Sequence, residues 1–112
     1  MTLRRIEYSA FKDCKNLKNI EFPDALEYIG RHSFLETGLE NVEFPASLRT
    51  VAQEAFARCK SLKTAMFREG LEVLGTDEYA SDDTMFHGVF EESALENVYL
   101  PYTLRRIEYC AF

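Results

Sequence analysis

The sequence predicts a repeat solenoid, built mainly of short parallel β-strands joined by tight turns, in a single domain. A nine-residue segment, LRRIEYSAF from Leu3, returns from Leu104 as LRRIEYCAF with one difference. Between these two copies the same apolar skeleton recurs every 22 or 23 residues until an insertion lengthens the last interval. A unit of this length cannot bury its own apolar side, whereas stacked units can, and this predicts a solenoid.

The repeats divide the chain into four full units and a partial fifth. Their bounds are residues 3–25, 26–47, 48–70, 71–103 with an insertion at about 76–88, and 104–112. The chain stops in the middle of a unit, and neither end shows a polar capping sequence. Because solenoids normally need such caps, we expect a fragment of a longer protein, or else open ends that associate with another copy.

Each unit has three parts in chain order. The opening L-x-x-I segment predicts a short strand on one wall of the solenoid. The Ala-Phe segment that follows predicts short 3₁₀ or helical turns, with an aromatic column between the walls. The closing L-x-x-I-x-F segment alternates apolar and polar residues and predicts a strand of the main parallel sheet, which a following proline helps to end. The expected aromatic column is Phe11, Phe34, Phe56, Phe90 and Phe112.

A period of two units lies over the single repeat. Odd units carry a cysteine before the second leucine, and even units carry Gly30 or Gly75 after the first Leu/Ile pair. Charges also alternate, because stacking opposite charges specifies the register of neighbouring strands. One such column is Arg4, Glu27, Arg49, Glu72 and Arg105, and a second is Lys18, Glu40, Lys63 and Glu96.

The three cysteines, Cys14, Cys59 and Cys110, have no metal-ligand spacing and predict buried apolar thiols. Cys14 and Cys59 fall two layers apart, about 9–10 Å at strand spacing, which is too far for a disulfide bond. We therefore expect no disulfide bond and no zinc site.

Composition and motifs exclude several classes of function. The formal net charge of −6 argues against nucleic acid as a partner, and no apolar run is long enough to insert in a membrane. The chain has no nucleophile elbow, phosphate-binding glycine loop or HExxH motif. His32 and His87 are isolated and predict surface or turn positions. We expect neither an enzyme nor a cofactor.

The first unit, LRRIEYSAFKDCKNLKNIEFPDA, closely resembles the BspA-like class of leucine-rich repeats, whose units of about 23 residues follow L-x-x-I-x-x-x-A-F-x-x-C-x-x-L-x-x-I-x-L-P. The resemblance covers the chain except the insertion. Even units lack the cysteine, and Arg68 replaces the third proline. The resemblance implies a curved solenoid used for binding, of a kind that many bacterial and protist surface proteins use to adhere to host or matrix proteins. A cell-surface or secreted location follows from the resemblance alone.

The outward residues of the L-x-x-I-x-F segments are the candidate binding site. One column is polar, and a neighbouring column changes from acidic to apolar along the stack, with a tyrosine just beyond. Exposed Met and Tyr are common interface anchors. The candidate residues are Asn19, Glu21, Asn41, Glu43, Met66, Asn97, Tyr99 and Tyr102. The alternative is a solvated sheet face without a partner.

The insertion and the paired arginines leave further alternatives open. The insertion offers a solvated loop, a partner contact or a weak divalent-cation site, through Asp77, Glu78, Asp82, Asp83 and His87, with Tyr79, Met85 and Phe86 beside them. Arg4-Arg5 and Arg105-Arg106 predict solvated strand faces, with anion binding as the alternative.

Taken together, the residues and the resemblance predict a non-catalytic protein-binding module whose protein partner they do not identify. The alternative is a structural spacer, or a solenoid that assembles end to end.

Overall fold

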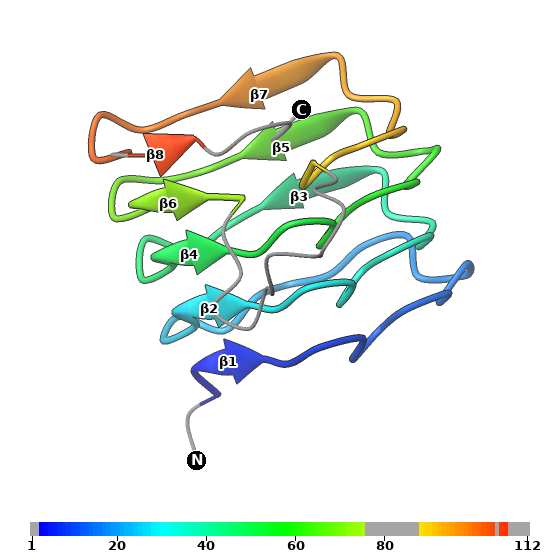
Figure 1. Cartoon of the computed structure of the whole chain (residues 1–112), viewed down its shortest axis with the longest axis horizontal. Coiled ribbons are helices and arrows are strands. Elements are labelled where there is room, and N and C mark those ends of the chain that lie inside the picture. The colour runs from blue at the N-terminus through cyan, green and yellow to red at the C-terminus, as the bar shows by residue number, and fades with distance from the viewer. Residues whose placement is uncertain (1–2, 76–87, 105, 108–112) are drawn as a thin grey trace, which may run out of the picture.

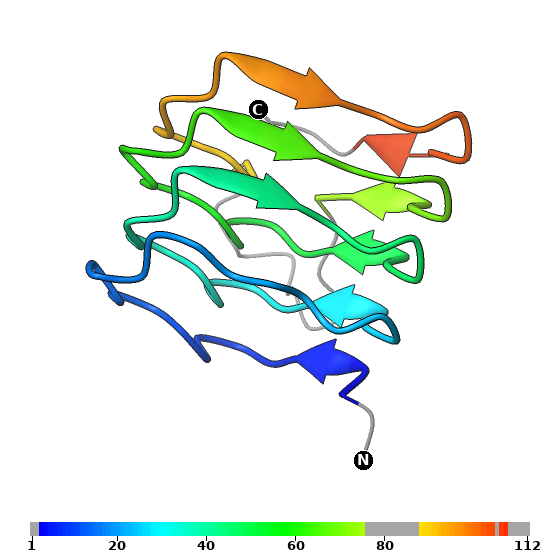
Figure 2. The same cartoon turned by 180° about the vertical axis from the view of Figure 1, so that it is seen from behind.

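The computed structural model describes residues 3–75, 88–104 and 106–107, and these parts of the chain wind into stacked coils (Figure 1). The coils contribute strands to two parallel sheets that form opposite walls, with turns between them (Figure 2). The strands are β1 (Arg5–Ile6), β2 (Tyr28–Ile29), β3 (Asn41–Glu43), β4 (Thr50–Val51), β5 (Thr64–Met66), β6 (Val73–Leu74), β7 (Asn97–Tyr99) and β8 (Arg106–Ile107). The predicted parallel β-solenoid is confirmed.

Sheet A is built from the L-x-x-I segments, in the order β1-β2-β4-β6-β8. Its register pairs equivalent residues of successive units, namely Ile6, Ile29, Val51, Leu74 and Ile107. Of these, Ile29, Val51 and Leu74 are fully buried. A slip of one residue would turn this apolar row outward, so burial fixes the register that the repeat predicts.

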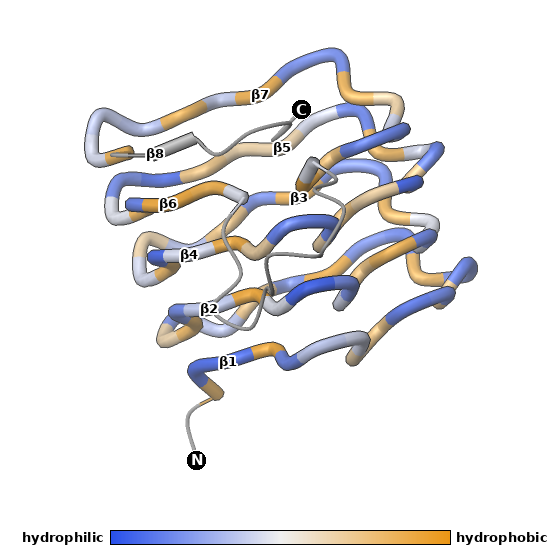
Figure 3. The backbone as a smooth tube through the Cα atoms, in the orientation of Figure 1, coloured by the Kyte–Doolittle hydropathy of each residue, from blue (hydrophilic) through white to orange (hydrophobic). Residues whose placement is uncertain are grey.

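Sheet B is built from the L-x-x-I-x-F segments, in the order β3-β5-β7. Apolar and polar residues alternate along these coils, and the inward Val42 and Ala65 are buried (Figure 3). The prediction of a strand in the first coil is wrong, because residues 17–22 form none. The Glu40 N–H donates to the Lys18 carbonyl at 3.2 Å, but the described residues form no continuous ladder there.

The Ala-Phe segments are runs of tight turns rather than 3₁₀ or helical turns. In the first coil the Ala10 N–H donates to the Glu7 carbonyl, three residues back, at 3.2 Å. Each run contains non-glycine residues with left-handed φ near 60°, which end any helical run at once. They are Ser9, Asp13, His32, Glu36, Glu54, Arg58 and Glu92. The sequence did not indicate this conformation.

The turns also bond to one another from coil to coil. The Phe34 N–H donates to the Ala55 carbonyl at 2.8 Å, and the Phe56 N–H donates to the Val89 carbonyl at 2.8 Å. These bonds satisfy backbone groups that the turns themselves leave unpaired. Backbone hydrogen bonds therefore join successive coils on the turn side of the solenoid, as they do within the sheets.

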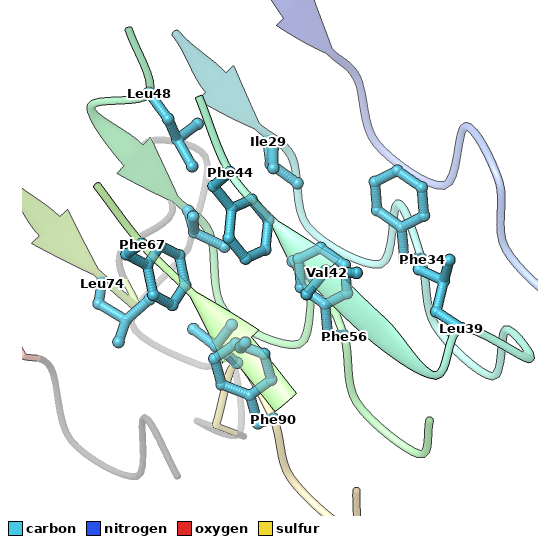
Figure 4. Close-up of a cluster of buried hydrophobic side chains, with 14 of the residues drawn as sticks. Ile29, Phe34, Leu39, Val42, Phe44, Leu48, Phe56, Phe67, Leu74 and Phe90 are labelled. Carbon is cyan, nitrogen blue, oxygen red and sulfur yellow. The ribbon is translucent and has the colours of Figure 1, made fainter. Parts of the chain in front are cut away.

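Two columns of phenylalanine rings fill the space between the walls (Figure 4). In the predicted column, ring centroids lie 5.1 Å apart for Phe11–Phe34, 5.0 Å for Phe34–Phe56 and 5.6 Å for Phe56–Phe90. The column is confirmed over these residues, and Phe112 lies outside the described ones. A second column, which was not predicted, consists of Phe22, Phe44 and Phe67, whose ring centroids are 5.2 and 4.4 Å apart.

The second leucine of each full unit lies in one interior file, as in-phase stacking requires. Leu39 and Leu62 are fully buried, and Leu17 and Leu95 pack against the same core while partly exposed. Among the described residues, Leu17 and Leu95 have a neighbouring segment of the sheet B wall on one side, whereas Leu39 and Leu62 have one on both sides.

The cysteines do not share one environment. Cys59 is buried, and its thiol donates to the Phe34 carbonyl at 3.1 Å, whereas Cys14 is exposed. Both are free thiols, and Cys110 lies outside the described residues. The prediction of a buried thiol is therefore wrong for Cys14, because no coil among the described residues lies below the first one.

Gly30 marks a close approach between coils. A β-carbon at this position would lie 2.9 Å from the Ile6 carbonyl oxygen and 3.0 Å from the Tyr8 nitrogen. Backbone atoms cannot move aside cheaply, so the even-numbered second coil requires glycine where odd units carry larger residues.

Candidate functional site

The outward side of sheet B, which we call the sheet B face, carries the predicted binding residues in vertical columns. The register places Asn41, Thr64 and Asn97 in one column. Glu43, Met66 and Tyr99 form the next, as the repeat predicts. Asn19 and Glu21 are also exposed, but they come from the first coil, which has no strand there.

The apolar part of the sheet B face lies toward the C-terminal end of the stack. Tyr99 is 52% exposed and Tyr102 is 99% exposed, while Met66 is half-buried. Leu100, between the two tyrosines, is 42% exposed although it occupies an inward position. Tyr99, Leu100 and Tyr102 thus form a run of exposed aromatic and aliphatic side chains at this end of the described stack.

The acidic part of the same face borders a shallow groove of about 490 Å³. It is lined by Asn19, Glu21, Asn41 and Glu43, together with Phe22 and Phe44. Arg68 closes one side, with its guanidinium 3.8 Å from the Glu43 carboxylate. The structure thus brings Asn19, Glu21, Asn41 and Glu43 together in one groove, and places Tyr99 and Tyr102 apart from it.

The alternating charge columns match the register but form few ion pairs. Arg4 lies 3.8 Å from Glu27, and both side chains are largely exposed. Arg49 instead donates to the carbonyls of Ala46 and Gly70, at 3.0 and 3.1 Å. In the described part of the chain the lysine column shows no ion pair within 4.0 Å. The columns therefore agree with the predicted register and contribute little to stability.

An ion-pair ladder on the turn side was not predicted. Arg58 lies 3.3 Å from Glu36 in the coil below and 3.3 Å from Glu92 in the coil above. Hydrogen bonding to Arg58, followed by that to Asp13, lowers the pKa of Glu36. The signal was available in the sequence, because these residues share one position of the repeat.

His32 is not the isolated residue that the sequence predicted, although it does lie in a turn. Its Nε2 atom is 3.0 Å from Glu54, and Arg31 is 3.5 Å from the same carboxylate. All three side chains are mostly buried, and the ring of Tyr8 lies 5.4 Å from the imidazole. Glu54 therefore serves as a shared partner between two coils.

The described residues hold no group of three His, Cys, Asp or Glu side chains placed to bind a metal ion. They also contain no apolar helix of the length needed to cross a bilayer. The candidate residues of the insertion, Asp77, Glu78, Tyr79, Asp82, Asp83, Met85, Phe86 and His87, lie outside the described residues, so their role stays a prediction.

Stacked coils of 22 or 23 residues, with a leucine file and parallel strands on two walls, define a leucine-rich repeat solenoid. The family model described as the BspA type leucine-rich repeat region (6 copies) matches residues 1–112. The chain belongs to this family, as the resemblance of its first unit predicted.

A solved structure supports the same fold. The chain is similar to the crystal structure of a leucine-rich repeat protein from Bacteroides ovatus, with a TM-score of 0.57 and 19% sequence identity. The match covers 95% of this chain and 43% of that one, so the chain spans less than half of its structural relative. No curated protein matches the sequence.

Proposed function

We propose that this chain is a non-catalytic module that binds another protein through the sheet B face, as part of an adhesion-type protein at the cell surface or in the secreted fraction. The observation that carries the proposal is the Glu43–Met66–Tyr99 column, in which the half-buried Met66 and the exposed Tyr99 follow the acidic Glu43 on a rigid scaffold. Neighbouring coils fix the backbone of this column, so little conformational entropy is lost when a partner binds.

The chemistry of the face favours an extended peptide segment as the part of the partner that is bound. Met66 and Tyr99 supply apolar contact, because methionine and tyrosine are enriched where proteins meet. The groove beside Asn41 and Glu43 supplies hydrogen-bond acceptors and amide donors. A segment with an apolar side chain and a nearby basic or amide group would contact both regions.

A library of random peptides displayed on phage tests the proposal without knowledge of the natural partner. Peptides selected on the wild-type chain should lose binding to the double variant Met66→Ala with Tyr99→Ala. Tyr8→Ala is the matched control, because Tyr8 is 65% exposed but belongs to the coil side away from sheet B. The proposal fails if selected peptides bind the double variant normally, or if Tyr8→Ala weakens them instead.

A further inference from the structure

We propose that a notch at the second coil binds an oxyanion, a sulfate, phosphate or carboxylate group, between the side chains of Lys15 and Lys60. The notch has a volume of about 320 Å³. It is lined by Lys15 of the first coil, residues 36–38 of the second, and Arg58, Lys60 and Ser61 of the third. None of these residues belongs to the sheet B face, so the inference does not rest on the proposed peptide binding.

The notch lies where the second coil is one residue shorter than the coils on either side of it. Between the predicted phenylalanine column and the second leucine, the first coil has KDCKN and the third has ARCKS, whereas the second has LETG. Lys15 and Lys60 occupy the same position of the longer segments. The two-unit period of the sequence therefore places two lysines on either side of a coil that has no residue to match them.

Contacts with both neighbours fix the shorter segment. The Gly38 N–H donates to the Cys14 carbonyl at 3.4 Å, and the Thr37 hydroxyl lies 3.4 Å from the Cys59 sulfur. A β-carbon at Gly38 would collide with the carbonyl oxygen of Lys15. Because this carbonyl belongs to the backbone, a side chain at position 38 cannot fill the notch without moving the first coil.

A neighbouring column shows what the notch lacks. Three residues further along the same two coils, Lys18 and Lys63 lie on either side of Glu40 of the second coil. The Glu40 N–H donates to the Lys18 carbonyl at 3.2 Å, and the Lys63 N–H donates to the Glu40 carbonyl at 2.8 Å. Between Lys15 and Lys60 the second coil supplies no such charge. An anion from solution would complete this column as Glu40 completes the other.

The two lysines are able to contact one anion together. Equivalent positions two coils apart lie about 9–10 Å from each other at strand spacing. Each ammonium group is carried on a flexible four-carbon stem, so both can turn toward a group midway between the backbones. Both side chains are exposed, and among the described residues neither Lys15 nor Lys60 has an ion pair within 4.0 Å. The exposed Ser61 hydroxyl adds a hydrogen-bond donor beside them.

The carboxylates near the notch are gathered around Arg58. Glu36 and Glu92 each lie 3.3 Å from its guanidinium, and Asp13 hydrogen-bonds to Glu36. Arg58 is therefore already shared between carboxylates, and the lysines are the cations left for a ligand. The same carboxylates repel any negative charge that extends beyond the lysines, so the site favours one compact anionic group over a polyanion.

A nuclear magnetic resonance titration of the full chain with inorganic sulfate tests the site. In ¹H–¹⁵N spectra at constant ionic strength, the amide signals of Gly38 and Ser61 should shift until they saturate, and sodium chloride should not reproduce the shifts. A monosaccharide sulfate, titrated in the same way, distinguishes the source of the anion. Tighter binding than inorganic sulfate indicates a group carried on a sugar, and equal or weaker binding indicates a free anion.

Two pairs of substitutions connect the signal to the lysines. Lys15→Gln with Lys60→Gln should raise the dissociation constant of sulfate about tenfold, because it removes both charged partners. Lys18→Gln with Lys63→Gln is the matched control, since it removes the same charge from the same two coils and should leave that constant unchanged. Ser61→Asp keeps both notch lysines, and it should also weaken binding because its carboxylate competes with sulfate for them.

Two results would overturn the proposal. The first is that neither sulfate nor the monosaccharide sulfate shifts the Gly38 and Ser61 signals. The second is that the Lys18→Gln, Lys63→Gln control weakens sulfate binding as much as the notch variant does, since binding would then depend on net charge alone. All of the replaced side chains are exposed, so each variant should keep the wild-type circular dichroism spectrum.

Discussion

Phe56 offers the sharpest test of the idea that stacked rings hold the coils together. Its side chain is fully buried, and its ring centroid lies 5.0 Å from Phe34, 5.6 Å from Phe90 and 5.5 Å from Phe44. Phe11 belongs to the same column but is 36% exposed and contacts one ring, Phe34, at 5.1 Å. Replacing each phenylalanine by leucine keeps an apolar side chain and removes the ring contacts.

The expected losses of stability differ by the number of ring contacts. An aromatic pair contributes about 0.5–1.5 kcal/mol beyond the area it buries, and a near-isosteric core replacement costs up to about 1.5 kcal/mol. Phe56→Leu removes three pairs and should lower the free energy of unfolding by about 3 kcal/mol. Phe11→Leu removes one pair at a partly exposed site and should cost about 1 kcal/mol.

Urea unfolding followed by far-ultraviolet circular dichroism and by tyrosine fluorescence measures both variants, since the chain has no tryptophan. Coincidence of the two signals shows whether a two-state treatment holds for this repeat protein. Equal losses for Phe56→Leu and Phe11→Leu would refute the reasoning, because ring contacts would then contribute nothing measurable.

Three further predictions follow from single contacts. Gly30→Ala should lower the free energy of unfolding by about 1–3 kcal/mol, seen as a lower Tm, because its β-carbon would crowd the backbone of the first coil. Iodoacetamide should alkylate Cys14 in the native protein but Cys59 only after unfolding, as peptide mass mapping would show, because Cys59 is buried and burial raises its pKa. Arg58 lowers the pKa of Glu36 below its ordinary value of 4.5, so the stability from this pair is present above that pH and lost below it. Arg58→Met should therefore flatten the acid side of the Tm profile, and an unchanged profile would contradict the pairing.

The sequence predicted the parts of the fold that depend on how successive units align. Once Leu39 and Leu62 are placed in one file, each other position of the unit lies next to the equivalent position of the neighbouring coil. The strand pairings of both sheets and the column through Met66 and Tyr99 follow from that alignment. Burial of the apolar side chains fixes the register between neighbouring strands, because a slip of one residue would expose an entire apolar row.

The predictions that proved wrong concern the first coil and the bonding partners of individual side chains. Cys14 is exposed and residues 17–22 form no strand, since a repeat pattern does not say that the first coil has one neighbour. Arg49 binds two backbone carbonyls rather than a glutamate, which sequence spacing does not determine. The left-handed turns, including His32, follow from coil geometry that a residue pattern alone does not fix.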